Sequence, residues 1–264
     1  MIGKQIRMER IMNRNTGKIL VVPIDHGMSD GPIPGLVNIK KTVKNIVEGG
    51  ANAVLMQKGI VGIGHRGGGS DTGLIVHLSA GTGLTPDPLE KVIVTTVEEA
   101  VALGTDAVSI HINVGARTTS QMLKDAGDVV RDCNRFGIPL LAMMYPRGKN
   151  IENEKDVNVV KIAARIGAEL GADIIKTNYT GDKESFKEVV DGCPVPVVIA
   201  GGSKGTEKEV LEKIRDAISV GAAGVAMGRN SFQHKTPDKF IKAASLVIHE
   251  KMDVDSAMRE AGLQ

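Results

Sequence analysis

A short pattern occurs four times along the chain and constrains the fold more than any other feature. In each copy a helical stretch ends at a glycine and an apolar strand follows at once. The four copies lie at residues 48–55, 103–110, 170–175 and 220–226. Glycine at the end of a helix supplies the left-handed backbone conformation that stops the helix. A helix that ends in this way before a buried strand is half of a βαβ unit.

Eight stretches have the length and composition of buried strands, and most are nearly continuous aliphatic runs, as is typical of parallel strands covered on both faces. They are Ile19–Asp25, Ala53–Lys58, Leu74–Ser79, Ala107–Asn113, Pro139–Tyr145, Ile174–Asn178, Val195–Ala200 and Gly224–Gly228. Helical patterns separate most of them, and the clearest lie at Thr95–Leu103, Val157–Leu170 and Glu207–Val220. This alternation predicts an α/β fold, a single (β/α)8 TIM barrel that forms one domain over residues 1–264.

An open, doubly wound sheet is the alternative fold for such an alternation. It would place a G-x-G-x-x-G turn after the first strand, and residues 25–29 lack that pattern. In a barrel, we expect roughly the first 15 residues to pack across the N-terminal end and residues 236–262 to close the ring of helices. Two glycine-bearing segments, Gly59–Gly73 and Gly81–Pro88, predict flexible loops at the C-terminal rim.

The composition is that of an ordinary globular protein and argues against several kinds of partner. Hydrophobic residues make up 42% and charged residues 24%, and a formal net charge of +2 gives no attraction to nucleic acid or to a membrane surface. The absence of Trp also counts against base stacking. Cys133 and Cys193 lack the spacing of a zinc or disulfide framework. We recognise no signal peptide or membrane span and therefore expect a cytoplasmic protein.

Lys176 is the residue with the clearest chemical meaning. It interrupts the apolar run 172–179, which we expect to be a buried strand. Burial disfavours the charged form of an amine, and an uncharged amine attacks carbonyl groups to form a Schiff base. The alternative is a lysine that reaches from a strand end into solvent. Lys58, at the end of the second strand, is a rival nucleophile or a neighbouring cation that assists Lys176.

Polar residues at the carboxyl ends of other strands would meet Lys176 at one mouth of the barrel. Asp25 could accept a proton beside a Schiff base, and Tyr145 could donate one during carbon–carbon bond cleavage. Their alternative roles are a cap on the following turn and a packed core aromatic. The forked guanidinium of Arg147 could bind a phosphate or a carboxylate, or form a salt bridge at the rim.

Glycine-bearing turns follow the seventh and the eighth predicted strands. These turns are Gly201-Gly202 and Gly228-Arg229. Many barrels bind phosphate at these two positions, where bare backbone amides and a helix N-terminus face the anion. The two turns therefore favour a phosphorylated ligand over plain tight turns.

A metal site is an alternative use of the histidines on the predicted strands. His26, His77 and His111 could together bind zinc. They lack a compact H-x-H pair and no acidic cluster accompanies them, so we expect a reaction without a metal or another cofactor. Single histidines on barrel strands are more often hydrogen-bonded core residues or substrate contacts.

Several segments jointly resemble the archaeal class I aldolase family, and the resemblance covers nearly the whole chain. They are Val22–Gly27, Met143–Gly148, Ile174–Thr177, Ala200–Gly202 and Val225–Asn230. Further stretches, at residues 48–54, 58–61, 64–67, 91–98 and 143–149, resemble the transaldolase branch of the family. Related fructose-bisphosphate aldolases usually have Trp two residues before the Tyr of Y-P-R-G, where this chain has Met143.

The resemblance implies a metal-independent class I enzyme and gives each motif a role. Lys176 matches the Schiff-base lysine, Asp25 the proton acceptor and Tyr145 the proton donor. The residues that match the sugar-phosphate-binding segments are His26, Gly27, Met28, Ser29, Pro146, Arg147, Gly201, Gly202, Gly228 and Arg229.

The transaldolase branch moves a ketol fragment from 6-deoxy-5-ketofructose 1-phosphate to a small aldehyde, L-aspartate 4-semialdehyde. Hydroxypyruvaldehyde phosphate departs, and the product feeds a route to 3-dehydroquinate and the aromatic amino acids. The resemblance also implies a homo-oligomer, with decamers among the known forms. The alternatives that stay open are a class I fructose-bisphosphate aldolase, a metal-dependent aldolase and a barrel that binds a sugar phosphate without catalysis.

Overall fold

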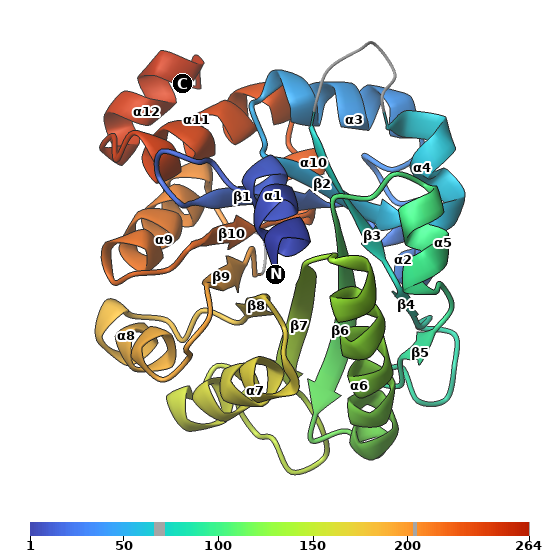
Figure 1. Cartoon of the computed structure of the whole chain (residues 1–264). Helices are drawn as coiled ribbons and strands as arrows, with labels where there is room; N and C mark the ends of the chain where they lie inside the picture. The colour runs from blue at the N-terminus through green and yellow to red at the C-terminus, as the bar shows by residue number, and fades with distance from the viewer. Residues whose placement is uncertain (66–71, 203–204, 264) are drawn as a thin grey trace.

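The computed structural model describes residues 1–65, 72–202 and 205–263, and in these ranges eight parallel strands close into a barrel (Figure 1). The strands are β1 (Ile19–Pro23), β2 (Ala53–Gln57), β3 (Gly73–His77), β6 (Ala107–Val114), β7 (Leu140–Pro146), β8 (Ile174–Thr177), β9 (Val197–Ala200) and β10 (Gly224–Ala226). β1 pairs with both β2 and β10, which closes the ring. The predicted (β/α)8 TIM barrel is therefore confirmed.

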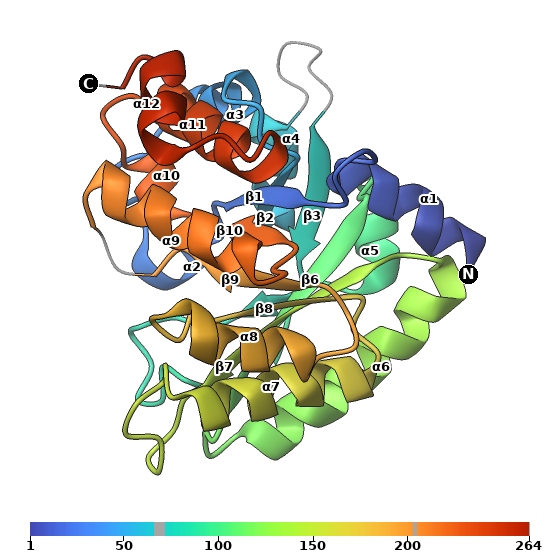
Figure 2. The ribbon, with the colours of Figure 1, turned by 90° about the vertical axis from the view of Figure 1, so that its left-hand side faces the viewer.

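Helices cover the outside of the barrel (Figures 1 and 2). In the described ranges they are α1 (Ile2–Ile11), α2 (Gly27–Asp30), α3 (Ile39–Glu48), α4 (Lys58–Gly64), α5 (Val97–Ala102), α6 (Thr119–Phe136), α7 (Val157–Leu170), α8 (Lys183–Asp191), α9 (Glu207–Ser219), α10 (Arg229–Phe232), α11 (Pro237–His249) and α12 (Val254–Ala261). None of these described helices has the length and apolar character that a bilayer crossing requires. A short antiparallel pair, β4 (Ser79–Ala80) and β5 (Val92–Ile93), lies outside the barrel sheet.

The glycines of the fourfold pattern take the conformation that the pattern predicts. The φ angles of Gly50, Gly104, Gly171 and Gly221 are 80°, 79°, 101° and 105°. These positive values are accessible to glycine at little cost and turn the chain out of each helix and into the next strand. The four helix-to-strand connections thus share one backbone conformation.

Alternate residues of each strand divide between an interior and an exterior core. In β1, Ile19 and Val21 pack inside the barrel, whereas Leu20 and Val22 pack outward beneath the helices. This division follows from the two-residue period of a strand, in which successive side chains point to opposite faces. The same period decides which polar side chains of the other strands can reach the interior.

The first helix closes the N-terminal end of the barrel, as expected. Lys4 Nζ lies 2.8 Å from Asp173 Oδ2, and Arg10 Nε lies 2.6 Å from Asp106 Oδ1. Both aspartates also accept backbone N–H groups from neighbouring strands. Figure 2 shows α1 on the side of the barrel away from α2 and α10. The opposite end, where the strands finish, is left free for chemistry.

The predicted loop at Gly59–Gly73 is wrong in its first part. Residues 58–64 form α4, which packs against α3. A Cβ at Gly64 would lie 2.6 Å from Ile39 Cγ2, so this glycine allows close packing of two helices and does not confer flexibility. Gly67–Gly69 lie outside the described residues. The second segment, Gly81–Pro88, is a loop between β4 and β5, as predicted.

Candidate active site

The strands bring the three predicted catalytic residues to the interior of one barrel end. Tyr145 on β7 belongs to the interior core. Lys176 on β8 follows the interior residue Ile174 by two positions, and Asp25 lies in the turn two residues after the end of β1. All three line one cavity of about 530 Å³ at the C-terminal ends of the strands. A cavity of this size suits a small sugar phosphate.

Lys176 is held inside the barrel wall. Its residue is 7% exposed, and its Nζ atom lies 3.9 Å from Met143 Sδ on the neighbouring strand β7. The hydroxyl of Thr177 donates a hydrogen bond of 2.8 Å to Met144 O, which ties β8 to β7 at this level. No carboxylate of the described residues forms an ion pair with this amine. The amine therefore faces the cavity with a thioether as its polar neighbour.

Two histidines flank the carboxylate of Asp25. His26 Nδ1 lies 3.5 Å from Asp25 Oδ1, and His77 Nε2 lies 3.9 Å from Asp25 Oδ2. The other ring nitrogen of His77 is 2.7 Å from Ser109 Oγ, which fixes the orientation of the ring. Ser109 and His77 lie on adjacent strands, so this orientation is built into the barrel.

Nearby charges lower the pKa of Asp25, and burial lowers the pKa of the two histidines beside it. Burial raises the pKa of Asp25, but His77, His26 and the ammonium of Lys176 lower it further, so the pKa lies below its usual range. Burial lowers the pKa of His77 and of His26, and the attraction of Asp25 only partly opposes this. Asp25 is thus available as a proton acceptor at neutral pH.

Tyr145 is held between two side chains at the mouth. Its ring meets His111 edge-on at 5.1 Å between centroids, and the Arg147 guanidinium carbon lies 4.5 Å from the centre of the tyrosine ring. His111 Nε2 lies 2.9 Å from Asn113 Oδ1, and burial lowers the pKa of His111 to about 3. The phenol therefore has a fixed position near a neutral imidazole and a cation.

The turns after β9 and β10 form the opposite wall of the cavity. Gly201, Gly202, Gly228 and Arg229 all line it. A Cβ on Gly228 would lie 2.4 Å from His26 Cε1, so only glycine fits beside this histidine. These positions present backbone amides and a guanidinium to the cavity, as an anion requires.

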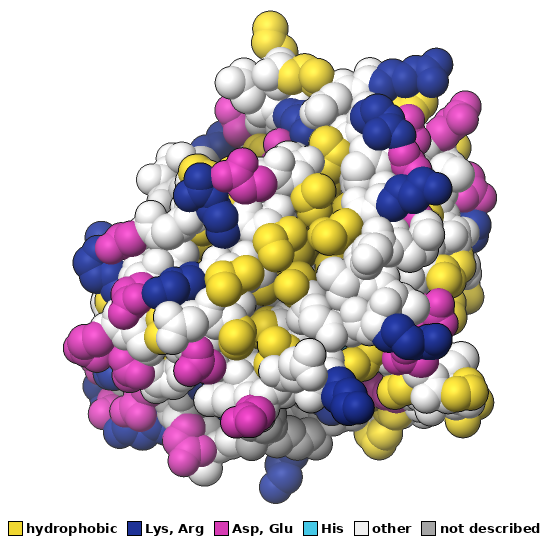
Figure 3. Space-filling model, turned by 90° about the horizontal axis from the view of Figure 1, so that it is seen from below, with side chains coloured by type: hydrophobic (Ala, Val, Ile, Leu, Met, Phe, Trp, Pro, Cys, Tyr) yellow, Lys and Arg dark blue, Asp and Glu magenta, His cyan; other side chains and the backbone are white. Residues whose placement is uncertain are grey.

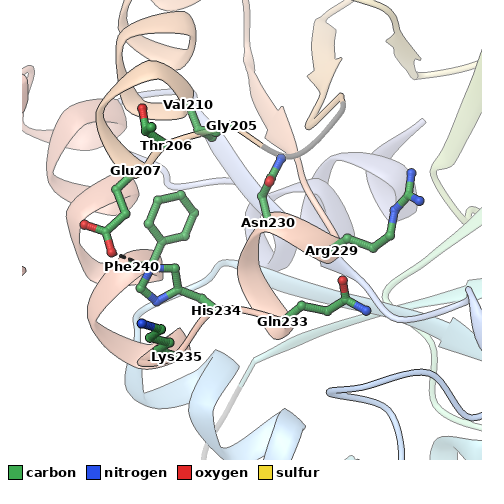
Figure 4. Close-up of a pocket in the computed structure, with 10 residues that line it drawn as sticks. All are labelled: Gly205, Thr206, Glu207, Val210, Arg229, Asn230, Gln233, His234, Lys235 and Phe240. Carbon is green, nitrogen blue, oxygen red and sulfur yellow. Dashed lines mark hydrogen bonds and ion pairs between the residues drawn. The ribbon is translucent and has the colours of Figure 1, made fainter.

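A smaller hollow of about 310 Å³ adjoins this wall (Figure 4). Arg229 and Asn230 of α10 belong to both hollows. At its far side His234 Nε2 lies 2.7 Å from Glu207 Oε1, and the His234 ring stacks on Phe240. Figure 4 shows this histidine and carboxylate joined to each other between α9 and α10. Neither residue of this pair lines the cavity that holds Lys176.

Most of the predicted binding residues meet at the cavity, and three do not. Asp25, His26, Ser29, Tyr145, Arg147, Lys176, Gly201, Gly202, Gly228 and Arg229 line it. Gly27 and Met28 line an adjoining apolar hollow, which Asp25 also lines, because the chain turns into the short helix α2 at Gly27. Pro146 is the last residue of β7 and lies in the barrel wall.

Reasoning from the sequence missed a cluster beside Arg147. Arg147 Nε lies 2.6 Å from Glu154 Oε2, and both residues line the cavity. Asn178 donates a hydrogen bond of 2.9 Å from Nδ2 to Glu154 O. Asn178 follows Lys176 by two positions, so the strand period gave a signal for it. No pattern in the charged segment 149–156 marks Glu154.

Lys58 and a metal site are not supported as parts of this cavity. Lys58 Nζ lies 2.9 Å from Glu99 Oε1 and 2.8 Å from Val94 O, and Lys58 lines the apolar hollow instead. The expectation that Lys58 assists Lys176 is therefore not supported. Within the described ranges, no three His, Cys, Asp or Glu side chains come together in a way that could bind a metal ion.

Comparison with known proteins gives a consistent result. A family model described as DeoC/LacD family aldolase matches residues 19–234. The chain is 45% identical to 2-amino-3,7-dideoxy-D-threo-hept-6-ulosonate synthase 1 of Archaeoglobus fulgidus, covering 99% of this chain and 97% of the relative. It is also 45% identical to the Halobacterium salinarum protein named as the same synthase, with the same two coverages.

The chain is also similar to solved structures of aldolases. A structure of a Schiff-base-forming fructose-1,6-bisphosphate aldolase matches with a TM-score of 0.87 at 32% identity, over 93% of this chain and 100% of the other.

Proposed function

The chain belongs to the DeoC/LacD family of aldolases, and we propose that it is a class I transaldolase that makes 2-amino-3,7-dideoxy-D-threo-hept-6-ulosonate. Its donor is 6-deoxy-5-ketofructose 1-phosphate and its acceptor is L-aspartate 4-semialdehyde. The observation that carries the proposal is the buried amine of Lys176, which shares one cavity with Asp25 and Tyr145. The relatives at 45% identity support this choice within the family.

The first half of the reaction cleaves the donor. Lys176 Nζ adds to a ketone carbon of the sugar, and loss of water leaves an iminium. Asp25 takes the proton from the hydroxyl group on the β carbon, and the bond between the α and β carbons breaks. The electron pair of that bond enters the iminium and gives an enamine, while hydroxypyruvaldehyde phosphate departs. A carboxylate with a low pKa suits the step in which Asp25 must be deprotonated.

The second half joins the retained ketol fragment to the acceptor. The nucleophilic carbon of the enamine attacks the aldehyde carbon of L-aspartate 4-semialdehyde. The proton held by Asp25 returns to the new alkoxide by way of the Tyr145 phenol, and water then hydrolyses the iminium to release the product and the free amine. The tyrosine is placed for this transfer by its contacts with His111 and Arg147.

The wall formed by the turns after β9 and β10 would hold the donor phosphate. Gly201, Gly202 and Gly228 bring the backbone close to the cavity, and Arg229 adds a charge. Lys213 lies near this wall, since a Cβ on Gly202 would be 3.5 Å from its Nζ atom. Burial lowers the pKa of Lys213, and the nearby cation Lys155 lowers it further. An anion between these lysines would relieve their repulsion.

A class I fructose-bisphosphate aldolase is the second candidate, and the structural match to such an enzyme favours it. Met143 argues against it, because related aldolases usually carry Trp at this position. The Met143 thioether is the polar neighbour of the Lys176 amine, so this difference lies at the reacting atom itself. A change there would alter which sugar fits beside the Schiff base.

The same proposal places the enzyme in the cytoplasm and makes it a homo-oligomer, with a decamer as the form that the family resemblance implies. Figure 3 shows hydrophobic side chains gathered in the middle of one face, with charged side chains mostly around its edge. A second subunit would cover such a surface. Light scattering of the purified protein would measure the assembly, and a monomer would contradict this part of the proposal.

Product analysis separates the two candidate activities. The purified protein is incubated with 6-deoxy-5-ketofructose 1-phosphate and L-aspartate 4-semialdehyde, and separately with fructose 1,6-bisphosphate alone. We expect the amino-heptulosonate, identified by mass, in the first mixture and little triose phosphate in the second. Efficient release of triose phosphates without the amino-heptulosonate would make the protein an aldolase.

A further inference from the structure

The ion pair between Arg147 and Glu154 is a feature of the cavity that the donor sugar does not explain. The side chains of Arg147 and Glu154 are 35% and 43% exposed, and both line the same cavity as Lys176. A sugar phosphate carries negative charge and no cation. A carboxylate that faces it can accept hydrogen bonds from the donor hydroxyl groups, but it repels the donor phosphate. The negative charge of Glu154 is therefore better matched to a ligand with a positive charge than to the donor phosphate.

The pair is placed close to the reacting groups. Arg147 follows Tyr145 by two positions, and its guanidinium carbon lies 4.5 Å from the centre of the tyrosine ring. Asn178, two positions after Lys176, holds the backbone of Glu154 through a hydrogen bond of 2.9 Å. Each member of the pair is thus tied to the strand that carries a proposed catalytic residue. A surface ion pair on a free loop would lack both connections.

The pair also lies apart from the wall that would hold the phosphate. Arg147 follows β7 and Arg229 begins the helix after β10, and β8 and β9 lie between these two strands in the barrel. Lys176 on β8 is between the two cationic groups. The cavity therefore has a guanidinium at the wall suited to phosphate, and a different region where a cation and an anion form an ion pair.

A neighbouring cation and anion complement a zwitterion. We propose that Glu154 and Arg147 select an amino acid aldehyde as the acceptor: the Glu154 carboxylate binds its ammonium group, and the Arg147 guanidinium binds its carboxylate. The inference rests on the proposed function and adds the residues that recognise the acceptor. In the free enzyme the two side chains satisfy each other. When the acceptor binds, its ammonium group takes the place of Arg147 beside Glu154, and its carboxylate takes the place of Glu154 beside Arg147. Neither side chain is then left with an unpaired charge.

The test compares two acceptors that differ in one group. L-aspartate 4-semialdehyde carries the ammonium group, and succinic semialdehyde has hydrogen in its place. The variants are Glu154→Gln, which keeps the shape and a hydrogen bond to Arg147, and Glu152→Gln, an exposed glutamate in the same loop that does not line the cavity. The readout is the ratio of kcat/KM for the two acceptors, or an inhibition constant where an acceptor is not turned over.

We expect Glu154→Gln to reduce the preference for the amino-bearing acceptor about tenfold or more, since a charge-assisted hydrogen bond is lost. Activity with succinic semialdehyde should change little, and Glu152→Gln should behave as the wild type. An equal loss with both acceptors would show that Glu154 only positions Arg147 and would overturn the inference. An unchanged preference would overturn it as well.

A donor-only reaction distinguishes failure of this inference from failure of the proposed function. Wild-type enzyme with 6-deoxy-5-ketofructose 1-phosphate and no acceptor should release hydroxypyruvaldehyde phosphate, and Glu154→Gln should release it at a similar rate. Release by both proteins, with the acceptor preference unchanged, would refute the role of Glu154 alone. No release by the wild type would refute the transaldolase itself, and the inference with it.

Discussion

At the scale of single residues, the site depends on groups whose charge is decided by their surroundings. Asp25 stays an anion because two histidines and Lys176 outweigh the effect of burial on its pKa. His111 stays neutral because burial lowers its pKa to about 3. Both effects follow from position in the barrel, and each leads to a measurable expectation.

Asp25→Asn should remove the proton acceptor and keep the shape of the side chain. We expect kcat of the transaldolase reaction to fall by roughly 10²–10⁴-fold, the usual effect of losing general acid–base catalysis. Borohydride should still trap the sugar on the protein, because the amine of Lys176 is unchanged. Steady-state kinetics with circular dichroism as the folding control would check this. Retention of more than about a tenth of wild-type kcat would argue against the role of Asp25.

The lowered pKa of His111 makes stability depend on pH. An unfolded histidine takes up a proton near pH 6.5, and folded His111 does so only near pH 3. Between these values the unfolded state binds one more proton, so the free energy of unfolding falls as the pH drops from about 6.5 towards 3.

His111→Asn should flatten this dependence. Urea denaturation at about pH 7 and about pH 5 should show a loss of stability that is smaller by about 1–2 kcal/mol in the variant than in the wild type. An equal loss in both proteins would mean that His111 is not the group that titrates.

At the scale of elements, α1 is bound to the barrel through aspartates that also bind strand backbones. Asp173 Oδ2 accepts from Lys4 Nζ and from Leu140 N, both at 2.8 Å. The carboxylate of Asp173, which directly precedes β8, thus joins α1 to β7. The arrangement lies at the N-terminal end of the barrel, opposite the cavity. Substitutions there should therefore change stability without changing catalysis.

Asp173→Ala should destabilise the protein without affecting the reaction. Loss of the ion pair and an unpaired Leu140 N–H predict a decrease of about 2 kcal/mol in the free energy of unfolding, with kcat/KM unchanged. The matched control is Asp191→Ala, which breaks only an exposed pair with Lys187 within one helix and should cost less than about 0.5 kcal/mol. A fall in kcat/KM for Asp173→Ala under native conditions would contradict this separation.

At the scale of the whole molecule, the barrel could be predicted because its signals repeat. Four of the connections use a glycine of the repeated pattern with positive φ, and the strand side chains follow a two-residue period. That period also placed Lys176 and Tyr145 inside the barrel. Both signals depend on residues close together in the chain and not on contacts between distant segments, so they could be recognised in the sequence.

The errors concern features that depend on contacts across the fold. Gly64 was taken as a sign of a loop, but it permits close packing of α4 on α3. Gly27 and Met28 are expected at the substrate, and the short helix α2 places them at an adjoining hollow that Asp25 also lines. Glu154 was missed because only its approach to Arg147, seven residues away, gives it meaning.

We expect the site to work without a metal ion. In the described residues, the histidines near Asp25 do not combine with further ligands into a group that could hold a metal ion. We expect the transaldolase rate to be unchanged after incubation with EDTA and dialysis. A loss of activity that zinc restores would favour a metal-dependent aldolase.

Borohydride trapping with peptide mapping tests the central claim most directly. The enzyme is incubated with 6-deoxy-5-ketofructose 1-phosphate, reduced, digested and examined by mass spectrometry. A reduced iminium should appear on Lys176 of β8 and be absent from a Lys176→Ala variant that folds normally. An adduct on Lys58, or no covalent adduct while the product still forms, would contradict the account.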